Sequence, residues 1–234
     1  MMAIAIKRVL VVVAHPDDAE FGCGGTVARW VKEGKEVSYV IATNGDKGSE
    51  DRSMTSERLA QIRAEEQLNA ARTLGVERVE FLGYPDGELE DTRDVRRDVT
   101  ARIRRFRPDL IVTQIPHRSS SLYASHRDHR ITGNVALDCV YPLARDHLSF
   151  PELVAQGLDP HKVREVYLMG TEHPELVVDI TDTMELKLKA LACHASQMGD
   201  FARVEARVRE RAALLGKPKG YAFAEAFSRI AIPR

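Results

Sequence analysis

The sequence predicts an α/β fold in which helices cover both faces of a mostly parallel sheet. Short apolar runs rich in β-branched residues recur between longer segments of helical periodicity. Strands that alternate with helices in this way form right-handed crossovers onto a parallel sheet. The chain has 234 residues, of which 44% are hydrophobic, enough for one sizeable core. We therefore expect a single domain over residues 1–234, with a small helical extension from about residue 184.

The predicted strands are apolar runs that end in polar or glycine-rich turns. The first, at residues 9–14, is mostly valine, which is typical of a parallel strand buried on both faces. The second runs into an Asn-Gly-Asp loop at residues 44–46, and the third is followed by a Pro-Asp-Gly turn at residues 85–87, both of which are turn signals. The expected strands cover residues 9–14, 37–43, 79–82, 110–115, 163–169 and 176–179.

The predicted helices lie between or after these strands. Gly34 and Gly75 each stand just past a helical pattern, where a glycine commonly closes a helix. In the second helix, Leu59, Ile62 and Leu68 recur near helical spacing, which indicates one buried face. The last helix is rich in arginine, which suits a solvated face or a contact between subunits. The expected helices cover residues 24–33, 56–74, 94–106, 128–140, 184–194 and 201–215.

The charge balance and the cysteine content exclude several classes of protein. Lys and Arg number 34 and Asp and Glu 35, for a net charge of −1, whereas nucleic-acid and membrane-surface binders are usually basic. Three cysteines without Cys-x-x-Cys spacing indicate a reducing compartment and no disulfide framework. The sequence shows neither a signal peptide nor an apolar segment near the roughly 20 residues that span a bilayer. We expect a cytoplasmic homo-oligomer with a small-molecule substrate and neither a nucleic-acid nor a membrane partner.

The first candidate site follows the first strand, where the apolar run ends abruptly in His15-Pro16-Asp17-Asp18. These polar groups begin where the strand leaves the core, at its carboxyl end, and ligands of open α/β sheets bind at that edge. Two adjacent carboxylates beside a histidine repel one another unless a positive charge holds them, and a divalent metal would serve. The alternative is a polar loop in which one aspartate caps the next helix.

A second cluster, His126-Arg127-Asp128-His129, follows the fourth strand. Histidines three apart at a helix start can face the same side, although Asp128 could simply favour the helix dipole. Because both clusters follow parallel strands, both lie at the same sheet edge. His15, Asp18 and one of the two later histidines would match the ligand set of hydrolytic zinc. That arrangement leaves Asp17 free to act as a base.

At this point the chain resembles the LmbE-like, or PIG-L-type, zinc-dependent N-acetylglucosaminyl deacetylases. The specific part of the resemblance is Ala-His-Pro-Asp-Asp at residues 14–18 paired with His-Arg-Asp-His at residues 126–129. Looser matches follow in the same order along the chain up to about residue 197. They are Glu20, Gly24-Gly25-Thr26, Thr43-Asn44-Gly45, Arg63 with Glu66, Leu82-Gly83 with Asp86, and Lys189-Ala190-Leu191 with His194 and Ser196-Gln197.

The resemblance implies a Rossmann-like three-layer αβα fold and a metal site for Zn²⁺, with Fe²⁺ as the alternative ion. Carried across residue by residue, it implies that His15, Asp18 and His129 bind the metal. Asp17 would then be the general base.

The resemblance also implies roles for four further residues. His126 would be a second catalytic group, oriented by Asp128 as in a carboxylate–histidine pair, and Arg63 and Asp86 would face the sugar substrate. Each of the last two has a simpler explanation. Arg63 could pair with a glutamate on its own helix, and aspartate is favoured in a Pro-Asp-Gly turn. We expect His194 to be a structural or supporting group rather than a ligand.

The implied reaction removes the N-acetyl group from an N-acetylglucosamine-type conjugate and gives acetate and a free amine. Zinc would lower the pKa of its water and polarise the amide carbonyl, Asp17 would take the proton, and His126 would help to stabilise the oxyanion. An amidase acting on thiol–sugar conjugates is the alternative with the same metal site. A receiver-type magnesium domain leaves the histidines unexplained.

Three departures from the family pattern bear on this interpretation. Ala19 precedes the acidic Glu20, which often follows the motif directly, and Arg127 stands where proline is frequent. Neither change touches an expected ligand. Lys47 lies in a loop where several relatives carry acidic residues, so the group attached to the sugar stays open.

Overall fold

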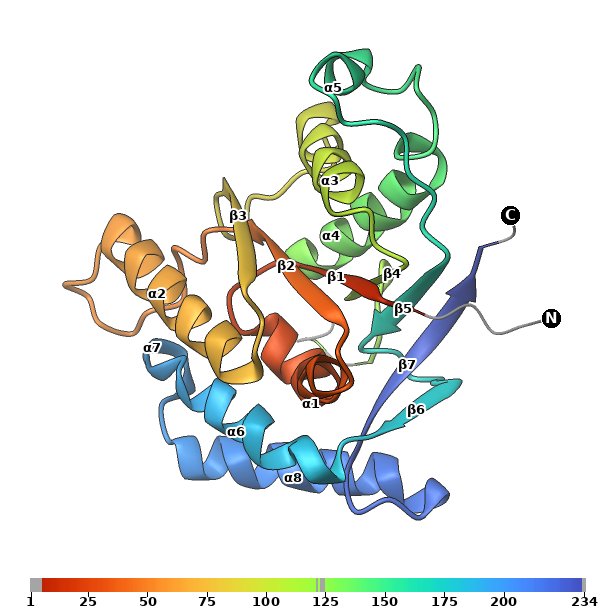
Figure 1. Ribbon diagram of the computed structural model, residues 1–234. Helices are drawn as coiled ribbons and strands as arrows, with labels where there is room; N and C mark the ends of the chain where they lie inside the picture. Colours follow the sequence, from red (N-terminus) through yellow and green to blue (C-terminus); the bar gives the residue numbers. More distant parts are fainter. Residues whose placement is uncertain (1–5, 121, 123–124, 233–234) are drawn as a thin grey trace.

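A computed structural model describes residues 6–120, 122 and 125–232 of the chain. Within these residues, strands form a sheet with the order β3-β2-β1-β4-β5-β7-β6. The pairs from β3 to β5 are all parallel, while β7 is antiparallel to both β5 and β6. The α/β, mostly parallel fold is therefore confirmed (Figure 1). The strands are β1 Arg8–Val13, β2 Glu36–Thr43, β3 Arg78–Tyr84, β4 Leu110–Gln114, β5 Glu165–Met169, β6 Leu176–Asp179 and β7 Ala224–Ala231.

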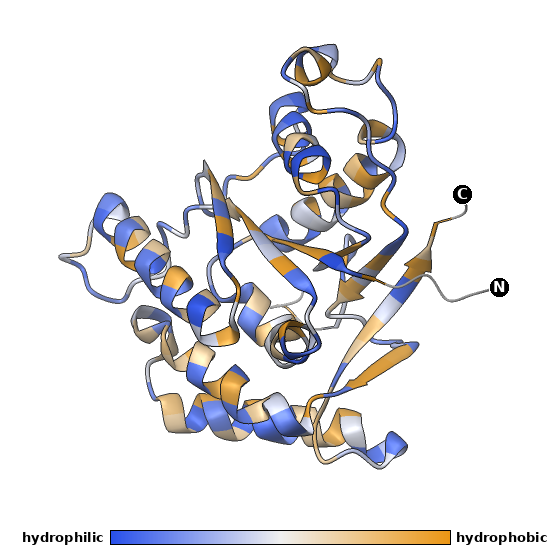
Figure 2. Ribbon diagram, viewed as in Figure 1, coloured by the Kyte–Doolittle hydropathy of each residue, from blue (hydrophilic) through white to orange (hydrophobic). Residues whose placement is uncertain are grey.

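Helices cover both faces of the sheet and complete the three layers (Figure 1). α1, α2 and α6 pack on one face, α3 and α4 on the other, and α8 packs outside α6. Figure 2 shows α3 as mostly hydrophilic, and only a few of its side chains reach the core. The helices are α1 Asp18–Lys32, α2 Ser56–Leu74, α3 Arg93–Phe106, α4 Arg127–Asp138, α5 Pro151–Ala155, α6 Met184–Ala192, α7 Ala195–Met198 and α8 Phe201–Gly216.

Strand β1 is the centre of both hydrophobic cores. Val9, Val11 and Val13 face the helices α1, α2 and α6, whereas Leu10 and Val12 face α3 and α4. Successive side chains of a strand point to opposite faces, so a strand covered on both faces must be apolar at every position. The five residues are at most 2% exposed. This burial fixes where the chain emerges at His15.

The C-terminal part differs from the expected helical extension. Helices α6, α7 and α8 are present, but the chain then returns as strand β7, which inserts between β5 and β6. Its sequence interrupts the apolar pattern with Glu225, Ser228 and Arg229, so its hydrophobic periodicity is weak. Within the described residues, no helix combines the length and the apolar character that crossing a membrane requires.

Helix α1 begins at Asp18, not at residue 24 as the sequence suggested, and it is kinked at Cys23, where φ is −147° and ψ 15°. In an unbroken helix the N–H of Gly25 would bond to the carbonyl of Phe21. Here the Phe21 carbonyl accepts from Lys187 Nζ at 2.8 Å, and the Gly25 N–H donates to Glu225 Oε1 at 3.0 Å. An ion pair from α6 and β7 thus replaces the missing helical bond.

The Lys187–Glu225 pair ties the C-terminal segment to the helix that follows the candidate site. The Nζ–Oε1 distance is 2.5 Å, and both side chains are almost fully buried. Glu225 also accepts the N–H of Thr26 at 2.7 Å. Removing one partner of a buried ion pair leaves the other charge without compensation, which costs about 3–5 kcal/mol.

We predict that Lys187→Met lowers the free energy of unfolding by about 3 kcal/mol or more, measured by urea denaturation at equal metal content. The matched control is Arg209→Met, which removes surface pairs with Glu185 and Glu205 and should cost about 1 kcal/mol or less. Equal losses for the two variants would contradict the structural role of the buried pair.

Candidate active site

The site lies at the carboxyl ends of β1 and β4, where the strand order reverses direction and where ligands bind in open α/β sheets. Both neighbouring strands hold the turn that leaves β1. The N–H of Ala14 donates to Gln114 Oε1 at 3.1 Å, and the carbonyl of Ala14 accepts from the N–H and the hydroxyl of Thr43 at 2.8 and 2.9 Å. The position of His15 is therefore set by hydrogen bonds that Gln114 of β4 and Thr43 of β2 make to the backbone of Ala14.

Three predicted ligands converge at this point. His15 Nδ1 lies 3.2 Å from His129 Nε2 and 3.3 Å from Asp18 Oδ2, and His129 Nε2 lies 3.0 Å from Asp18 Oδ1. Four ligands at the bond lengths of a tetrahedral zinc site are about 3.3 Å apart. The donor atoms and their spacing therefore fit a divalent ion of this kind, with two imidazoles and one carboxylate.

Other donor groups overlap with this set. His126 lies with His15 and His129 in one possible cluster, and Asp86 and Asp128 lie with His15 in another. The two nitrogens of His15 face different partners: Nδ1 faces Asp18 and His129, whereas Nε2 faces the two other carboxylates. An imidazole that binds a metal through one nitrogen normally carries its proton on the other. This division favours the set that contains Asp18.

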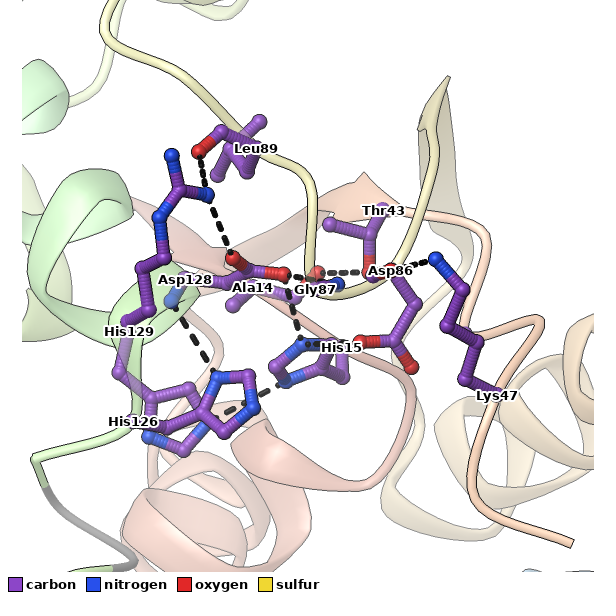
Figure 3. Close-up of polar contacts among 12 residues, drawn as sticks. Ala14, His15, Thr43, Lys47, Asp86, Gly87, Leu89, His126, Asp128 and His129 are labelled. Carbon is purple, nitrogen blue, oxygen red and sulfur yellow. Dashed lines mark hydrogen bonds and ion pairs between the residues drawn. The ribbon is translucent and has the colours of Figure 1, made fainter.

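Asp128 has a different neighbour from the one expected. Its Oδ2 lies 3.4 Å from His15 Nε2 and accepts the N–H of Gly87 at 2.6 Å, and Asp86 Oδ1 lies 3.1 Å from the same nitrogen. Among the described contacts the Asp128 carboxylate lies against His15 (Figure 3), and its expected role in orienting His126 stays a prediction. Two carboxylates on Nε2 favour a proton there and leave Nδ1 free for a metal.

His126 is held by a hydrogen bond from the backbone. It caps helix α4, and its Nδ1 accepts the N–H of Asp128 at 3.2 Å. Burial lowers the pKa of His126, and the nearby His15 and His129 lower it further. In a neutral imidazole whose Nδ1 accepts, the proton is on Nε2. His126 can therefore offer an N–H donor beside the metal-ligand set, as an oxyanion requires.

Asp17 occupies a strained position next to Asp18. Its φ is 89°, in the left-handed region, which residues with a side chain rarely adopt. Its carboxylate lies 3.4 Å from Arg63 Nη2. Burial and the adjacent charge of Asp18 raise the pKa of Asp17 to about 7, against the opposing charge of Arg63. A carboxylate with a raised pKa suits a general base that works near neutral pH.

The guanidinium of Arg63 is occupied mainly by protein atoms. It donates to the carbonyls of Pro16 at 2.8 Å and Gly45 at 3.1 Å and lies 3.7 Å from Asp86 Oδ2. Glu66, the partner suggested by helical spacing, instead bonds to Ser196. Arg63 thus links the turn after β1 with the two following loops. Its contact with a sugar, like that of Asp86, stays a prediction.

Sequence reasoning missed Gln67 and gave no role to Glu20. The side chain of Gln67 bonds to the N–H of Asp17 and to Glu20, and Glu20 also contacts His194. The available signal was that Gln67 lies four residues after Arg63 and therefore on the same face of α2. His194 is fully buried, and its described side-chain contact is with Glu20. Lys47 donates to the carbonyl of Asp86 at 2.7 Å.

Comparisons with known proteins identify the family. The family model described as PIG-L, GlcNAc-PI de-N-acetylase, matches residues 10–140. The chain belongs to the PIG-L family. It is 35% identical over 222 residues to the diacetylchitobiose deacetylase of Thermococcus kodakarensis, covering 94% of this chain and 82% of the relative. It is 29% identical over 196 residues to a probable N-acetyl-alpha-D-glucosaminyl L-malate deacetylase 2 of Bacillus cereus, covering 82% and 84%.

A solved structure with the same fold covers almost the whole chain. The N,N'-diacetylchitobiose deacetylase of Pyrococcus horikoshii superposes with a TM-score of 0.91 at 36% identity, over 97% of this chain and 84% of that one. The resemblance inferred from the two sequence motifs is therefore confirmed.

In this PIG-L chain, a close approach between α4 and β4 holds the two halves of the site together. A Cβ on Gly133 would lie 2.2 Å from the backbone oxygen of Gln114, and backbone atoms cannot move aside cheaply. His129 lies one turn before Gly133 on α4, and Gln114 bonds to the turn after β1. A shift of α4 would therefore separate His129 from His15.

We predict that Gly133→Ala weakens the binding of added Zn²⁺ by roughly tenfold or more, because it displaces His129, one of the predicted ligands, from the other two. Competition with a chelator of known affinity measures this change. Gly24→Ala is the control: it is the same substitution in another buried helix, where the nearest atom would lie at an ordinary 3.5 Å. Unchanged zinc affinity in Gly133→Ala would show that the packing of α4 does not set the site.

Proposed function

We propose that this protein is a metal-dependent hydrolase that removes the N-acetyl group from a small N-acetylglucosamine-type conjugate and releases acetate and a free amine. Membership of the PIG-L family supports the reaction class. The observation that carries the proposal is the meeting of His15 Nδ1, His129 Nε2 and the Asp18 carboxylate within 3.3 Å of one another, with Asp17 adjacent.

His15, Asp18 and His129 would hold the ion, which we expect to be Zn²⁺, with Fe²⁺ as the alternative. Such an ion, when bound, lowers the pKa of a water molecule and polarises the amide carbonyl. Asp128 and Asp86 support this set by accepting from His15 Nε2, which keeps the opposite nitrogen available as a ligand. Outer partners of this kind commonly change metal affinity by roughly 10–100-fold.

Proton transfer falls to the residues around the ligands. The Asp17 carboxylate accepts the proton of the attacking water, and its raised pKa allows it to hold that proton near neutrality. His126 Nε2 donates a hydrogen bond to the oxygen that gains charge as the amide carbon becomes tetrahedral. Asp17 or His126 then protonates the departing amine.

We propose Arg63 and Asp86 as the residues nearest the sugar. Both are largely buried, and they lie beside Asp17 and His15, respectively. A sugar positioned for reaction at these two residues would therefore also contact Arg63 and Asp86. The thiol–sugar amidase alternative uses the same groups. A screen that compares acetate release from N-acetylglucosamine conjugates with hydrolysis of thiol conjugates separates the two activities.

We predict that His15→Ala and His129→Ala each lose most of their zinc, because each removes one of the three protein ligands. Metal content after dialysis, measured by elemental analysis, checks this outcome. His147→Ala provides the control, because His147 is exposed and pairs only loosely with Asp146, and it should keep the wild-type content. Full occupancy in both ligand variants would remove the assigned site.

We predict that Asp17→Asn keeps its zinc but lowers kcat for acetate release by about 10²–10⁴-fold, because an amide cannot accept the proton of the attacking water. The control is Asp51→Asn, which changes an exposed aspartate in the loop between β2 and α2 and should leave kcat unchanged. Zinc-loaded Asp17→Asn with wild-type turnover would show that another group is the base.

A further inference from the structure

We infer that Gln67, Glu20 and His194 form a buried relay that positions Asp17 for proton transfer. The inference rests on the proposed role of Asp17 as the general base. None of the three residues belongs to the ligand set, and each comes from a different element: Gln67 from α2, Glu20 from α1, and His194 from the junction between α6 and α7.

The relay ends on the backbone of Asp17 itself. The N–H of Asp17 donates to Gln67 Oε1 at 3.0 Å, while φ at Asp17 is 89°. A residue with a side chain held in this region costs about 1–3 kcal/mol unless its surroundings determine it. Arg63 restrains the carboxylate only at 3.4 Å. The bond to Gln67 therefore restrains the N–H side of the residue directly, while the carbonyl of Asp17 accepts the N–H of Phe21 at 3.0 Å within the start of α1.

Glu20 determines which way the Gln67 amide faces. Gln67 Nε2 lies 3.1 and 3.2 Å from the two oxygens of the Glu20 carboxylate. A carboxylate accepts hydrogen bonds, so it must receive the amide NH₂ and leave the amide oxygen for Asp17. The reversed amide would place donors against the N–H of Asp17 and oxygen against carboxylate. Only one orientation satisfies both ends.

His194 completes the set of partners for Glu20. Its Nε2 lies 3.2 Å from Glu20 Oε2, and both side chains are fully buried. Burying a carboxylate is costly unless hydrogen bonds replace its water. Gln67 and His194 supply them from two other elements, so the position of Glu20 depends on the packing of α2 and of the C-terminal segment. The arrangement connects that segment to the backbone of Asp17 through consecutive hydrogen bonds.

A merely structural network and a positioning relay predict different kinetics. A structural network would lower stability and reduce every property of the site together. The relay contacts Asp17, whereas His15 and His129 are held by other partners. Loss of the relay should therefore reduce kcat and leave the Michaelis constant and the zinc affinity nearly unchanged.

Gln67→Met tests the inference, because methionine has a similar length but cannot hold the N–H of Asp17. In the zinc-loaded protein we expect kcat to fall by roughly tenfold to 100-fold, the effect of misplacing a reacting group. KM and the zinc dissociation constant should stay within about threefold. Hydrogen exchange at the Asp17 amide should become at least about tenfold faster. Gln61→Met, an exposed position on the same helix, should match the wild type.

Glu20→Gln is the second variant and carries the test if Gln67→Met does not fold. Its amide oxygen can still accept from Gln67, so we expect the same pattern with a smaller fall in kcat. A folded Gln67→Met with wild-type kcat, or with kcat, KM and zinc affinity changed in parallel, overturns the relay. A wild type without acetate release overturns the proposed function, whereas wild-type exchange at the Asp17 amide in Gln67→Met overturns the restraint alone.

Discussion

The structure depends on compensating the negative charge that gathers where β1 ends. Asp17, Asp18, Asp86 and Asp128 all lie within one or two contacts of His15. Burial alone would raise the pKa of Asp18, but the positive character of His129 and His15 holds it well below its usual range. Such a cluster is stable only with positive charge at its centre. Arg63 supplies it on the Asp17 side, and a divalent ion between the ligands would supply it on the other.

The surrounding fold keeps this cluster in place through the backbone. Bonds from β2 and β4 clamp Ala14, and the kinked start of α1 is completed by Lys187 and Glu225 from the C-terminal segment. The same segment reaches Glu20 through His194. Elements distant in the sequence therefore together hold the turn after β1, which is strained at Asp17.

The sequence was informative where local pattern determines position. Val9 to Val13 had to be a strand buried on both faces, so His15 and Asp18 had to emerge at the sheet edge. The same logic placed both later histidines at that edge, and only the family resemblance selected His129 as the ligand. It was less informative where partners come from distant segments. Strand β7 has weak periodicity and gains its place only from pairing with β5 and β6. The Asp128 carboxylate could have met either histidine, and only the approach of Gly87 and His15 decides between them.

Asp17, Asp18 and Glu20, at the start of α1, carry the same chemical group, but their side chains point toward different partners. Residues two apart in a helix are turned by about 200° from one another, so Asp18 and Glu20 cannot face the same partners. Asp18 faces the two imidazoles, whereas Glu20 faces Gln67 and His194, with the buried Ala19 between them. Asp17 precedes the helix in a left-handed conformation that turns it to Arg63. Because each carboxylate has its own donors, Asp18 is available as the proposed metal ligand while Asp17 is available as the proposed base. The third acid, Glu20, can then act only by positioning the residues that it contacts.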